Sequence, residues 1–551
     1  MKIGSVVLKT VYLLFLAALA ALGDAFFEGG STGLAGIGVK ALVYLCLFSG
    51  FFAGSAWLVG SFRDGMDSPR AWHRCFEYGK GNILRLSLLF FAVYFCYLLV
   101  FYPGVTSSDT VYQLEDLLTG TRPMPYPVNF SGGTMSALMS DHHPVVTTLV
   151  FALFYRLGLL AGDANRGLFL YSLLQSACLS VSAATVVCYM DRLRVPKPVA
   201  LISAVFYASP VVAVFAVFMG KDMLFALCFV LYFHVFTWLA LNPQGRGGSK
   251  KQWVLLMLYS VLIALMNKKG MYIALFADLC LVFAVSGRKK LLALPAAVLP
   301  FFVVAVLMQR LLFPVFDIAP GGRQEMLGTA FQQTALAMRE CPEHYSAEEK
   351  NLFFSMFDVP PEELEEAYNP ARADEVKNHF RQDASGEDVR AYLGMWAAHF
   401  PREAGLYLRA TLSVSGGYLA PFKAYNVYLG VPYSETLGAF SQPDRLAPLR
   451  ENLFSLLCWL QNIPLLSVFS QDSFYVFWFP AFSLYFFCRQ RQWRKLVLLA
   501  PLAANLLFLL IGPVCITRYG LCQLLTFPML FAVTAQLGIS SRIDMEGRID
   551  G

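Results

Sequence analysis

The polar stretch after the apolar run that ends at Phe101 carries the residues best suited to chemistry. Pro103 breaks the preceding helix, and Asp109 lies where a new helix can begin. A carboxylate that caps this helix would point back toward the membrane surface. Beside a cavity, such a carboxylate suits general-base work on an acceptor hydroxyl. The alternative is that Asp109 is only a helix cap.

A second polar group, Asp141, His142 and His143, ends the same loop just before the next apolar segment. Carboxylate oxygens and imidazole nitrogens can bind a substrate or hold a divalent metal ion. The alternative is an interfacial loop without a ligand. Because two such clusters flank one loop, the functional interpretation is favoured over the alternative.

Three further groups place cations next to apolar segments, namely Lys221-Asp222, Lys268-Lys269 and Arg518-Tyr519. Cations at the outer membrane face suit the phosphate or pyrophosphate of a lipid-linked substrate. Each group also has a simpler interpretation. Lys221 and Asp222 can mark an ordinary loop, and the other cations can anchor helix ends to lipid headgroups.

Two weaker motifs begin the long polar region after residue 315. Gly321-Gly322-Arg323 is a candidate flexible anion contact, and Gln332-Gln333 follows on a predicted helix. We predict that Arg323, Gln332 and Gln333 bind substrate, with the alternative that they serve only the local fold.

The elements that must position these residues are membrane helices. Of the 551 residues, 57% are hydrophobic and only 15% charged, whereas a soluble domain carries about 25% charged residues. Continuous apolar runs of about 17–25 residues recur, which is the length of a spanning helix, and no alternating strands of a barrel are seen. The sequence therefore predicts an all-α, polytopic transmembrane bundle of about 11–13 membrane helices with a small, mostly helical extracytoplasmic domain.

The predicted spans and domains follow from these runs. The spans are about 5–23, 38–61, 84–102, 144–161, 167–189, 199–218, 222–242, 252–266 with 271–287, 291–314, 473–488, 495–513 and 518–538. The domains are an N-terminal two-helix addition with a cytoplasmic loop (1–83), a transmembrane module with external loop 103–143 (84–314), an extracytoplasmic helical region (315–450), and C-terminal helices with a short tail (451–551).

Basic loops set the orientation, because Lys and Arg gather on the cytoplasmic side. The segments around Arg74, Arg192, Lys250 and Lys289 are then cytoplasmic, and loop 103–143 and region 315–450 are external. Successive single spans should alternate between the two sides of the membrane, and this alternation fails at one point. If the loop before residue 144 and the loop near residue 166 are both external, segment 144–161 cannot cross once, and it is either re-entrant or flanked by a loop that breaks the rule.

Charge and cysteine content exclude other classes. The net charge of +6 has no dense basic run, so no nucleic-acid partner is expected. Most of the twelve cysteines lie inside apolar segments, and no CxxC pair or metal-type spacing occurs, so a disulfide framework is not expected. We interpret the N-terminal apolar run as an uncleaved first helix rather than a signal peptide.

The order of the motifs resembles the GT-C superfamily of integral-membrane glycosyltransferases, which includes protein O-mannosyltransferases and the aminoarabinose transferase of lipid A. Asp109, His143-Pro144 and Asp222 match, in order, the first-loop Asp, the His/Lys-Pro-Pro-like motif and the later external Asp of those enzymes. GT-C loops often carry paired acids, whereas Asp109 is flanked by Ser108 and Thr110.

A closer resemblance is to an uncharacterised family of polytopic membrane proteins from Gram-positive and related bacteria. The shared elements are Pro-Gly…Asp-Thr…Gln, Asp-His-His-Pro, Lys-Asp-Met-Leu-Phe, Asn-Lys-Lys-Gly, Gln-Gln and Arg-Tyr. They cover most of the chain from about residue 84 to 538, and the first two helices look like an addition.

The resemblance implies an inverting transferase of the bacterial plasma membrane that uses a polyprenyl-phosphate-linked sugar. Asp109 would be the catalytic base, cations such as Lys268, Lys269 or Arg518 would hold the phosphate, and an envelope glycan, lipid or protein would accept the sugar. A divalent metal ion is a candidate cofactor, with Asp109, His143 and Asp222 as its ligands. The alternatives are a transporter or flippase for a lipid-linked or anionic substrate, and a non-catalytic envelope-polysaccharide assembly protein.

Overall fold

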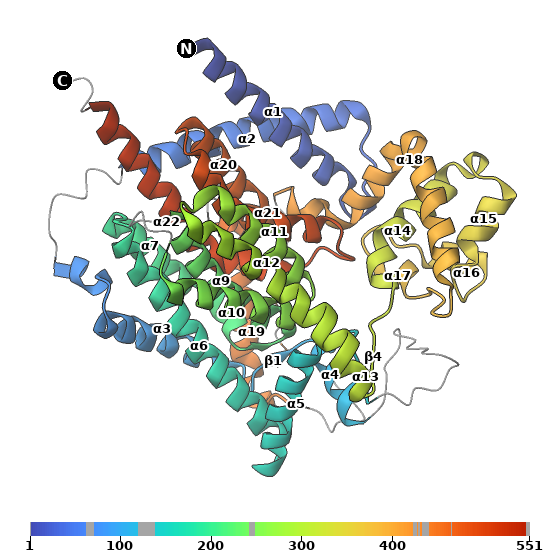
Figure 1. The fold of residues 1–551 in the computed structure, drawn as a ribbon, viewed down its shortest axis with the longest axis horizontal. Coiled ribbons are helices and arrows are strands. Elements are labelled where there is room, and N and C mark those ends of the chain that lie inside the picture. The colour runs from blue at the N-terminus through green and yellow to red at the C-terminus, as the bar shows by residue number, and fades with distance from the viewer. Residues whose placement is uncertain are drawn as a thin grey trace.

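The computed structural model describes residues 2–61, 71–119, 138–241, 248–421, 427, 430–431, 440–463 and 466–546. Long helices form a bundle, and a separate group of shorter helices lies at one end of it (Figure 1). Strands are limited to four two-residue segments in the described residues. The all-α, polytopic fold predicted from the apolar runs is confirmed. The middle of the predicted external loop, 120–137, lies outside the described residues.

The bundle consists mainly of α1 (Lys2–Phe26), α2 (Leu34–Ser61), α3 (Lys80–Val100), α5 (Val145–Leu160), α6 (Ala164–Arg192), α7 (Lys197–Tyr207), α8 (Pro210–Ala216), α9 (Lys221–Leu241), α10 (Lys250–Met266), α11 (Lys269–Ala284), α12 (Ala293–Phe301), α13 (Phe313–Val315), α20 (Phe479–Arg489), α21 (Ala500–Leu510) and α22 (Thr517–Glu546). The π-helical η5 (Phe302–Leu312) joins α12 to α13, and η10 (Phe474–Trp478) leads into α20.

Seven helices among the described residues are long and apolar enough to cross a membrane, or eight if the bent pair α7 and α8 forms one span. This number is lower than the predicted 11–13. The difference arises because several predicted spans are short helices: α5 and α11 have 16 residues each, and α10 has 17. A helix rises about 1.5 Å per residue, so these helices fall somewhat short of the ~30 Å hydrocarbon core.

Helix α5 resolves the parity conflict. It begins at the loop that holds His143, and its far end turns directly into α6. Asn165, at that turn, exchanges hydrogen bonds with Ser441, and the neighbouring Gln442 donates to the carbonyl of Gly104 at 3.2 Å. Both ends of α5 therefore lie at the same end of the bundle, and α6, with 29 residues, makes the crossing alone.

The predicted spans 252–266 and 271–287 form a tight helical hairpin of α10 and α11. A Cβ on Gly270 would lie 2.2 Å from the carbonyl oxygen of Ile263, so only glycine allows the two helices to approach this closely. The turn contains Asn267 and Lys268. The hairpin thus places two cations at a helix end, where a charge costs far less than in the middle of a membrane span.

Two short parallel strand pairs hold the loops that carry polar residues. β1 (Val105–Thr106) pairs with β3 (Phe218–Met219), and β2 (Met139–Ser140) pairs with β4 (Ile318–Ala319). β1 leads into α4 (Ser108–Leu118), and β3 leads into α9. These pairings bring together the loops that hold Asp109 and Lys221, although the two residues are far apart in sequence.

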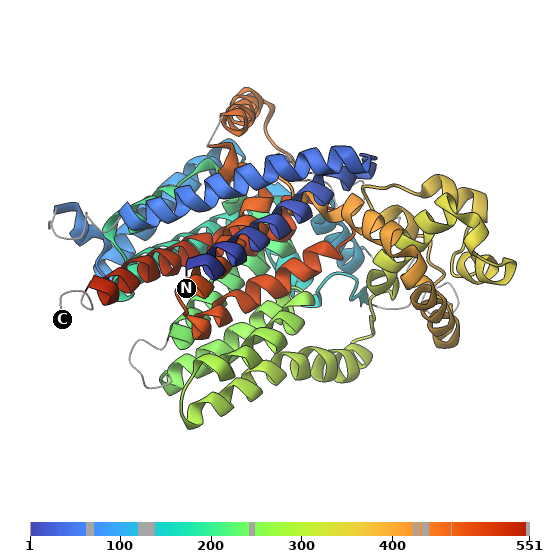
Figure 2. The ribbon, with the colours of Figure 1, turned by 90° about the horizontal axis from the view of Figure 1, so that it is seen from above.

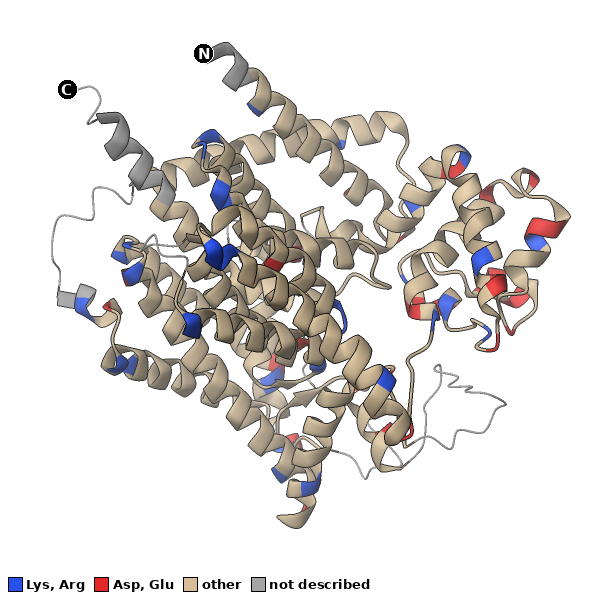
Figure 3. Ribbon diagram, in the orientation of Figure 1, with Lys and Arg blue, Asp and Glu red and all other residues tan. Residues whose placement is uncertain are grey.

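Region 315–450 contains its own helical core. Its helices are α14 (Gln324–Glu340), α15 (Ala347–Phe354), α16 (Pro361–Ala367), α17 (Asp374–Lys377) and α18 (Gly386–Ser415). Phe331 of α14 is fully buried at the centre of this core and packs against Tyr392 and Phe357. Most acidic residues of the protein gather here, whereas the bundle is poor in acids (Figure 3). The predicted mostly helical character of this region is confirmed.

The amphipathic α19 (Ala447–Asn462) stands apart from the main bundle (Figure 2). Phe454 and Trp459 on this helix are exposed. The sequence predicted an interfacial or partly inserted helix over residues 452–470. Helix α19 has the exposed apolar side chains that a helix at the membrane interface needs.

Candidate functional site

Asp109 lies in the first turn of α4, with its carboxylate between two cations. Its Oδ2 atom is 2.9 Å from Nζ of Lys221 and 3.0 Å from Nη2 of Arg518. The side chains of Asp109, Lys221 and Arg518 are only 16%, 15% and 9% exposed. The pairing of β1 with β3 brings Asp109 close to Lys221. Arg518 lies at the start of α22.

The same two cations extend the network to His143 and Asp222. Nζ of Lys221 donates to Nδ1 of His143 at 2.8 Å, and Nε of Arg518 lies 3.6 Å from Oδ2 of Asp222. Asn267, in the turn of the α10–α11 hairpin, donates to Oδ1 of Asp222 at 3.3 Å. Five segments far apart in the sequence thus meet around the two cations.

A second ion pair continues from the hairpin turn. Nζ of Lys268 is 2.9 Å from Oδ2 of Asp141 and also donates to the backbone carbonyl of Asp141. Asp141 is buried, whereas the Lys268 side chain is 36% exposed. Gly321 packs against this pair, because a Cβ there would lie 2.7 Å from Nζ of Lys268. Lys268 is therefore the most solvent-accessible of these cations.

Lys269 differs from the other cations. Its ammonium donates to the carbonyl of Tyr519 at 3.2 Å and lies 5.0 Å from the ring centroid of Phe225. No carboxylate within the described residues forms an ion pair with it. A partly buried ammonium held by a carbonyl and an aromatic face is available to an incoming anion.

We call these residues the polar cluster: Asp109, Asp141, His143, Lys221, Asp222, Lys268, Lys269 and Arg518. It contains four cations and three carboxylates, so with a neutral His143 its net charge is about +1. The sequence placed all eight on the external side, and the structure brings them to one end of the bundle. An anion, rather than another cation, fits this charge balance.

Protonation states follow from the geometry. Burial acts to raise the pKa of Asp109, but the charges of Lys221 and Arg518 more than offset it, so the pKa lies well below its ordinary value. Burial, aided by the Lys221 ammonium, keeps the pKa of His143 well below its ordinary value. Burial raises the pKa of Asp141, and Lys268 offsets only part of that effect. Asp109 is thus ionised, and His143 is neutral and accepts a hydrogen bond from Lys221.

The expected metal site at Asp109, His143 and Asp222 does not fit this arrangement. The ammonium of Lys221 occupies the space between Asp109 and His143, where a metal ion would have to lie. The guanidinium of Arg518 bridges the two carboxylates in the same way. Two positive side chains already neutralise two negative ones, so a divalent cation would meet no surplus negative charge.

Three predicted substrate-binding residues lie elsewhere. Arg323 donates to the carbonyl of Ala384 at 3.0 Å. Gln332 donates to the carbonyl of Asn369 at 2.7 Å, and Gln333 donates to Thr411 at 2.9 Å. These hydrogen-bond partners belong to α14–α18 and the segments that connect these helices. The three side chains therefore hold that region together and are not part of the polar cluster.

His142 and Tyr519 lie beside the cluster. The rings of His142 and His143 meet edge to face with centroids 4.6 Å apart, and burial lowers the pKa of His142 to about 4. The Arg518 guanidinium carbon is 5.3 Å from the ring centroid of Tyr519. The predicted substrate-binding residues His142 and Tyr519 thus lie next to the polar cluster.

Two residues that were not among the predicted site residues, Ser107 and Gln113, brace the cluster. Ser107 accepts a hydrogen bond from Nη1 of Arg518 at 3.2 Å. Gln113 is buried, and its Oε1 accepts hydrogen bonds from Thr147 at 2.9 Å and Thr148 at 3.1 Å. The signal for Gln113 was its place four residues after Asp109, one helical turn along the same face.

The fold and the cluster define a multi-pass helical membrane protein with a buried, ion-paired site at one end of its bundle. The chain matches the Family of unknown function (DUF6020) over residues 79–542 and belongs to that family. The match leaves α1 and α2 outside it. Neither the curated proteins nor the solved structures give a match to this chain.

Proposed function

We propose that the protein is a membrane glycosyltransferase that moves a sugar from a polyprenyl-phosphate donor to an envelope acceptor on the outer face of the bacterial plasma membrane. The observation that carries this proposal is the position of Asp109 between Lys221 and Arg518. The resemblance of the motif order to GT-C transferases supports the same conclusion.

The cations have the chemistry that a lipid-linked phosphate requires. The Lys268 side chain is 36% exposed, and Lys269 has no carboxylate partner among the residues described. These two lysines would meet the donor phosphate first. Arg518 and Lys221 would then complete the site, since a guanidinium can bind two phosphate oxygens at once.

Asp109 needs this phosphate before it can act as a base. Held by two cations, its carboxylate has too little proton affinity to deprotonate a hydroxyl well. When Lys221 and Arg518 turn to the phosphate, Asp109 loses part of its counter-charge and its proton affinity rises. Donor binding would thereby activate the base, and the base would stay inactive while no donor is present.

In the transfer step, the acceptor hydroxyl gives its proton to Asp109, and its oxygen forms a bond to the anomeric carbon of the sugar. The bond between that carbon and the phosphate oxygen breaks, and the electron pair leaves with the polyprenyl phosphate. Arg518 and the lysines stabilise the negative charge that develops on the phosphate.

The test is transfer by the purified protein in liposomes, with radiolabelled polyprenyl-phosphate sugars and cell-envelope acceptors. We expect transfer by the wild type and a loss of at least about 100-fold in Asp109→Asn, as for removal of a general base. The matched control Asp191→Asn removes a carboxylate paired with Lys197 in another part of the bundle and should transfer normally. Lipid movement across the bilayer without transfer would instead establish the flippase, and full activity of Asp109→Asn would exclude Asp109 as the base.

A further inference from the structure

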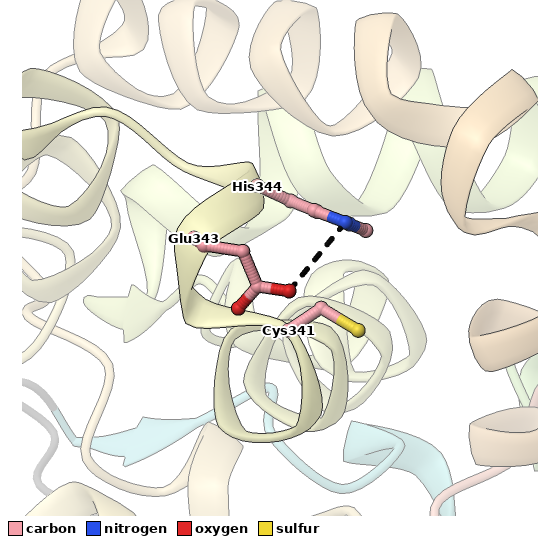
Figure 4. Close-up of side chains that lie close together, drawn as sticks. All are labelled: Cys341, Glu343 and His344. Carbon is pink, nitrogen blue, oxygen red and sulfur yellow. Dashed lines mark ion pairs between the residues drawn. The ribbon is translucent and has the colours of Figure 1, made fainter.

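Three potential metal ligands meet at the end of α14, away from the polar cluster. The ligand atoms of Cys341, Glu343 and His344 all lie within 4.8 Å of one another, and they are the only such group among the described residues. Their side chains extend to the same side of the chain (Figure 4). The sequence had indicated no metal-type spacing of cysteines anywhere in the chain.

The local backbone explains why these side chains converge. Cys341 follows the last residue of α14, and η6 (Pro342–His344) begins at once. The N–H of His344 donates to the carbonyl of Cys341 at 3.1 Å, which closes a tight turn. Pro342 fixes the backbone at the start of that turn. A thiol, a carboxylate and an imidazole are thus held on one turn of chain.

A second, independent feature is the buried carboxylate behind His344. Glu403 of α18 is 2% exposed, and its Oε1 lies 2.5 Å from Nδ1 of His344. A carboxylate accepts hydrogen bonds, so Nδ1 carries the proton and the lone pair of Nε2 points the other way. Nε2 lies 3.7 Å from Oε1 of Glu343. Metal-binding histidines commonly have this arrangement, in which a carboxylate fixes the ring and raises its basicity.

The distances suit a small tetrahedral ion. Zinc binds sulfur at about 2.3 Å and nitrogen or oxygen at about 2.0–2.2 Å, so neighbouring ligands lie roughly 3.3–3.8 Å apart. The 3.7 Å between His344 and Glu343 is already within this range. Because the three ligand atoms lie within 4.8 Å of one another, the Cys341 thiol needs to approach by no more than about 1.5 Å.

The charges around the thiol also favour a cation. The carboxylates of Glu343, Glu403 and Glu340 act electrostatically on the Cys341 thiol and outnumber the Arg402 guanidinium that also acts on it. A divalent ion would interact favourably with these carboxylates and would stabilise the thiolate.

We propose that Cys341, Glu343 and His344 bind one Zn²⁺, with Glu403 positioning His344 from behind. Thiolate, imidazole and carboxylate together select zinc over magnesium or calcium. Three protein ligands leave a fourth position for water or another ligand. The ion would link the end of α14 to α18 through the His344–Glu403 contact. This site is independent of the proposed transfer reaction.

The experiment uses the full-length protein in detergent, with its affinity tag removed and its thiols reduced. The protein is stripped with a chelator, incubated with Zn²⁺ or Co²⁺ and desalted, and bound metal is measured by mass spectrometry. We expect one zinc per chain for the wild type, loss of that zinc in Cys341→Ser and His344→Gln, and about 10–100-fold weaker binding in Glu403→Gln, as for other residues that position a ligand.

Cys458→Ser and His379→Gln are matched controls elsewhere in the chain and should keep the zinc. Should Cys341→Ser fail to fold, the Co²⁺ spectrum of the wild type decides, since a thiolate ligand gives an intense charge-transfer band in the near ultraviolet. No zinc on the wild-type protein, equal zinc on a folded Cys341→Ser variant, or a Co²⁺ spectrum without that band would each overturn the proposal.

Discussion

The substitution Asp109→Asn should lower transfer and at the same time tighten binding of polyprenyl phosphate. The wild-type carboxylate competes with the phosphate for the same cations, Lys221 at 2.9 Å and Arg518 at 3.0 Å. A uniform loss of local structure would weaken both properties. A lower transfer rate together with a higher affinity for polyprenyl phosphate would therefore show that Asp109 and the phosphate compete for the same cations.

The magnitude follows from the ion pairs. Unit charges about 4 Å apart attract by about 4 kcal/mol at an effective dielectric constant of 20. Much of this attraction is offset by desolvation and by side-chain rearrangement, since Asp109 is partly exposed. We expect a net gain in phosphate affinity of about 1.4–2.8 kcal/mol, which corresponds to about 10–100-fold tighter binding.

The assay is equilibrium binding of radiolabelled polyprenyl phosphate to the purified protein, beside the transfer rate of the same preparation. Asp191→Asn is again the control, and its affinity should equal that of the wild type. Unchanged or weaker binding by a folded Asp109→Asn variant would refute the idea that the Asp109 carboxylate occupies the cations that bind the phosphate.

Three further predictions concern the surroundings of the cluster. Lys268→Met should destabilise the protein by about 1–3 kcal/mol, because it leaves the buried Asp141 carboxylate without its cation, and adding Asp141→Asn should restore most of that loss in a thermal unfolding assay. Gly321→Ala should cost about 1–3 kcal/mol and lower transfer, since its Cβ would lie 2.8 Å from the backbone carbonyl oxygen of Asp141. His142→Gln should flatten the fall in stability between pH 6.5 and about 4, because the unfolded chain binds the His142 proton in this window and the folded protein does not.

Each of these predictions has its own control. For Gly321→Ala the control is Gly394→Ala. A Cβ on Gly394, on the exposed side of α18, would meet nothing within 4 Å, so this substitution should leave the stability equal or slightly higher. Additive losses in the Lys268 and Asp141 variants would mean that the two side chains do not interact. For His142, the wild-type slope is at most about 1.4 kcal/mol per pH unit, and an equal slope in His142→Gln would assign the acid sensitivity to other groups.

The local sequence predicted correctly those features that depend on neighbouring residues alone. The apolar runs predicted the polytopic bundle, because burying a helix in lipid depends on its own side chains. It was a poorer guide to the number of spans. Helix α5 is apolar, yet both of its ends lie at the same end of the bundle, where Asn165 contacts Ser441. That contact joins residues 276 positions apart, and no local pattern encodes it.

In the candidate site, too, some features follow from the local sequence and others only from the tertiary structure. The sequence by itself determined which charges lie beside apolar segments, because such charges are few and each interrupts a hydrophobic run. Only the tertiary structure decided their partners: Lys221 pairs with Asp109 across 112 positions, and Arg518 reaches Ser107 across 411. It also placed Gln332 and Gln333 in the interior of a separate helical region, and it brought Glu403 of α18 next to His344. The physical reason is that hydrophobicity acts residue by residue, whereas an ion pair depends on where folding brings two distant residues.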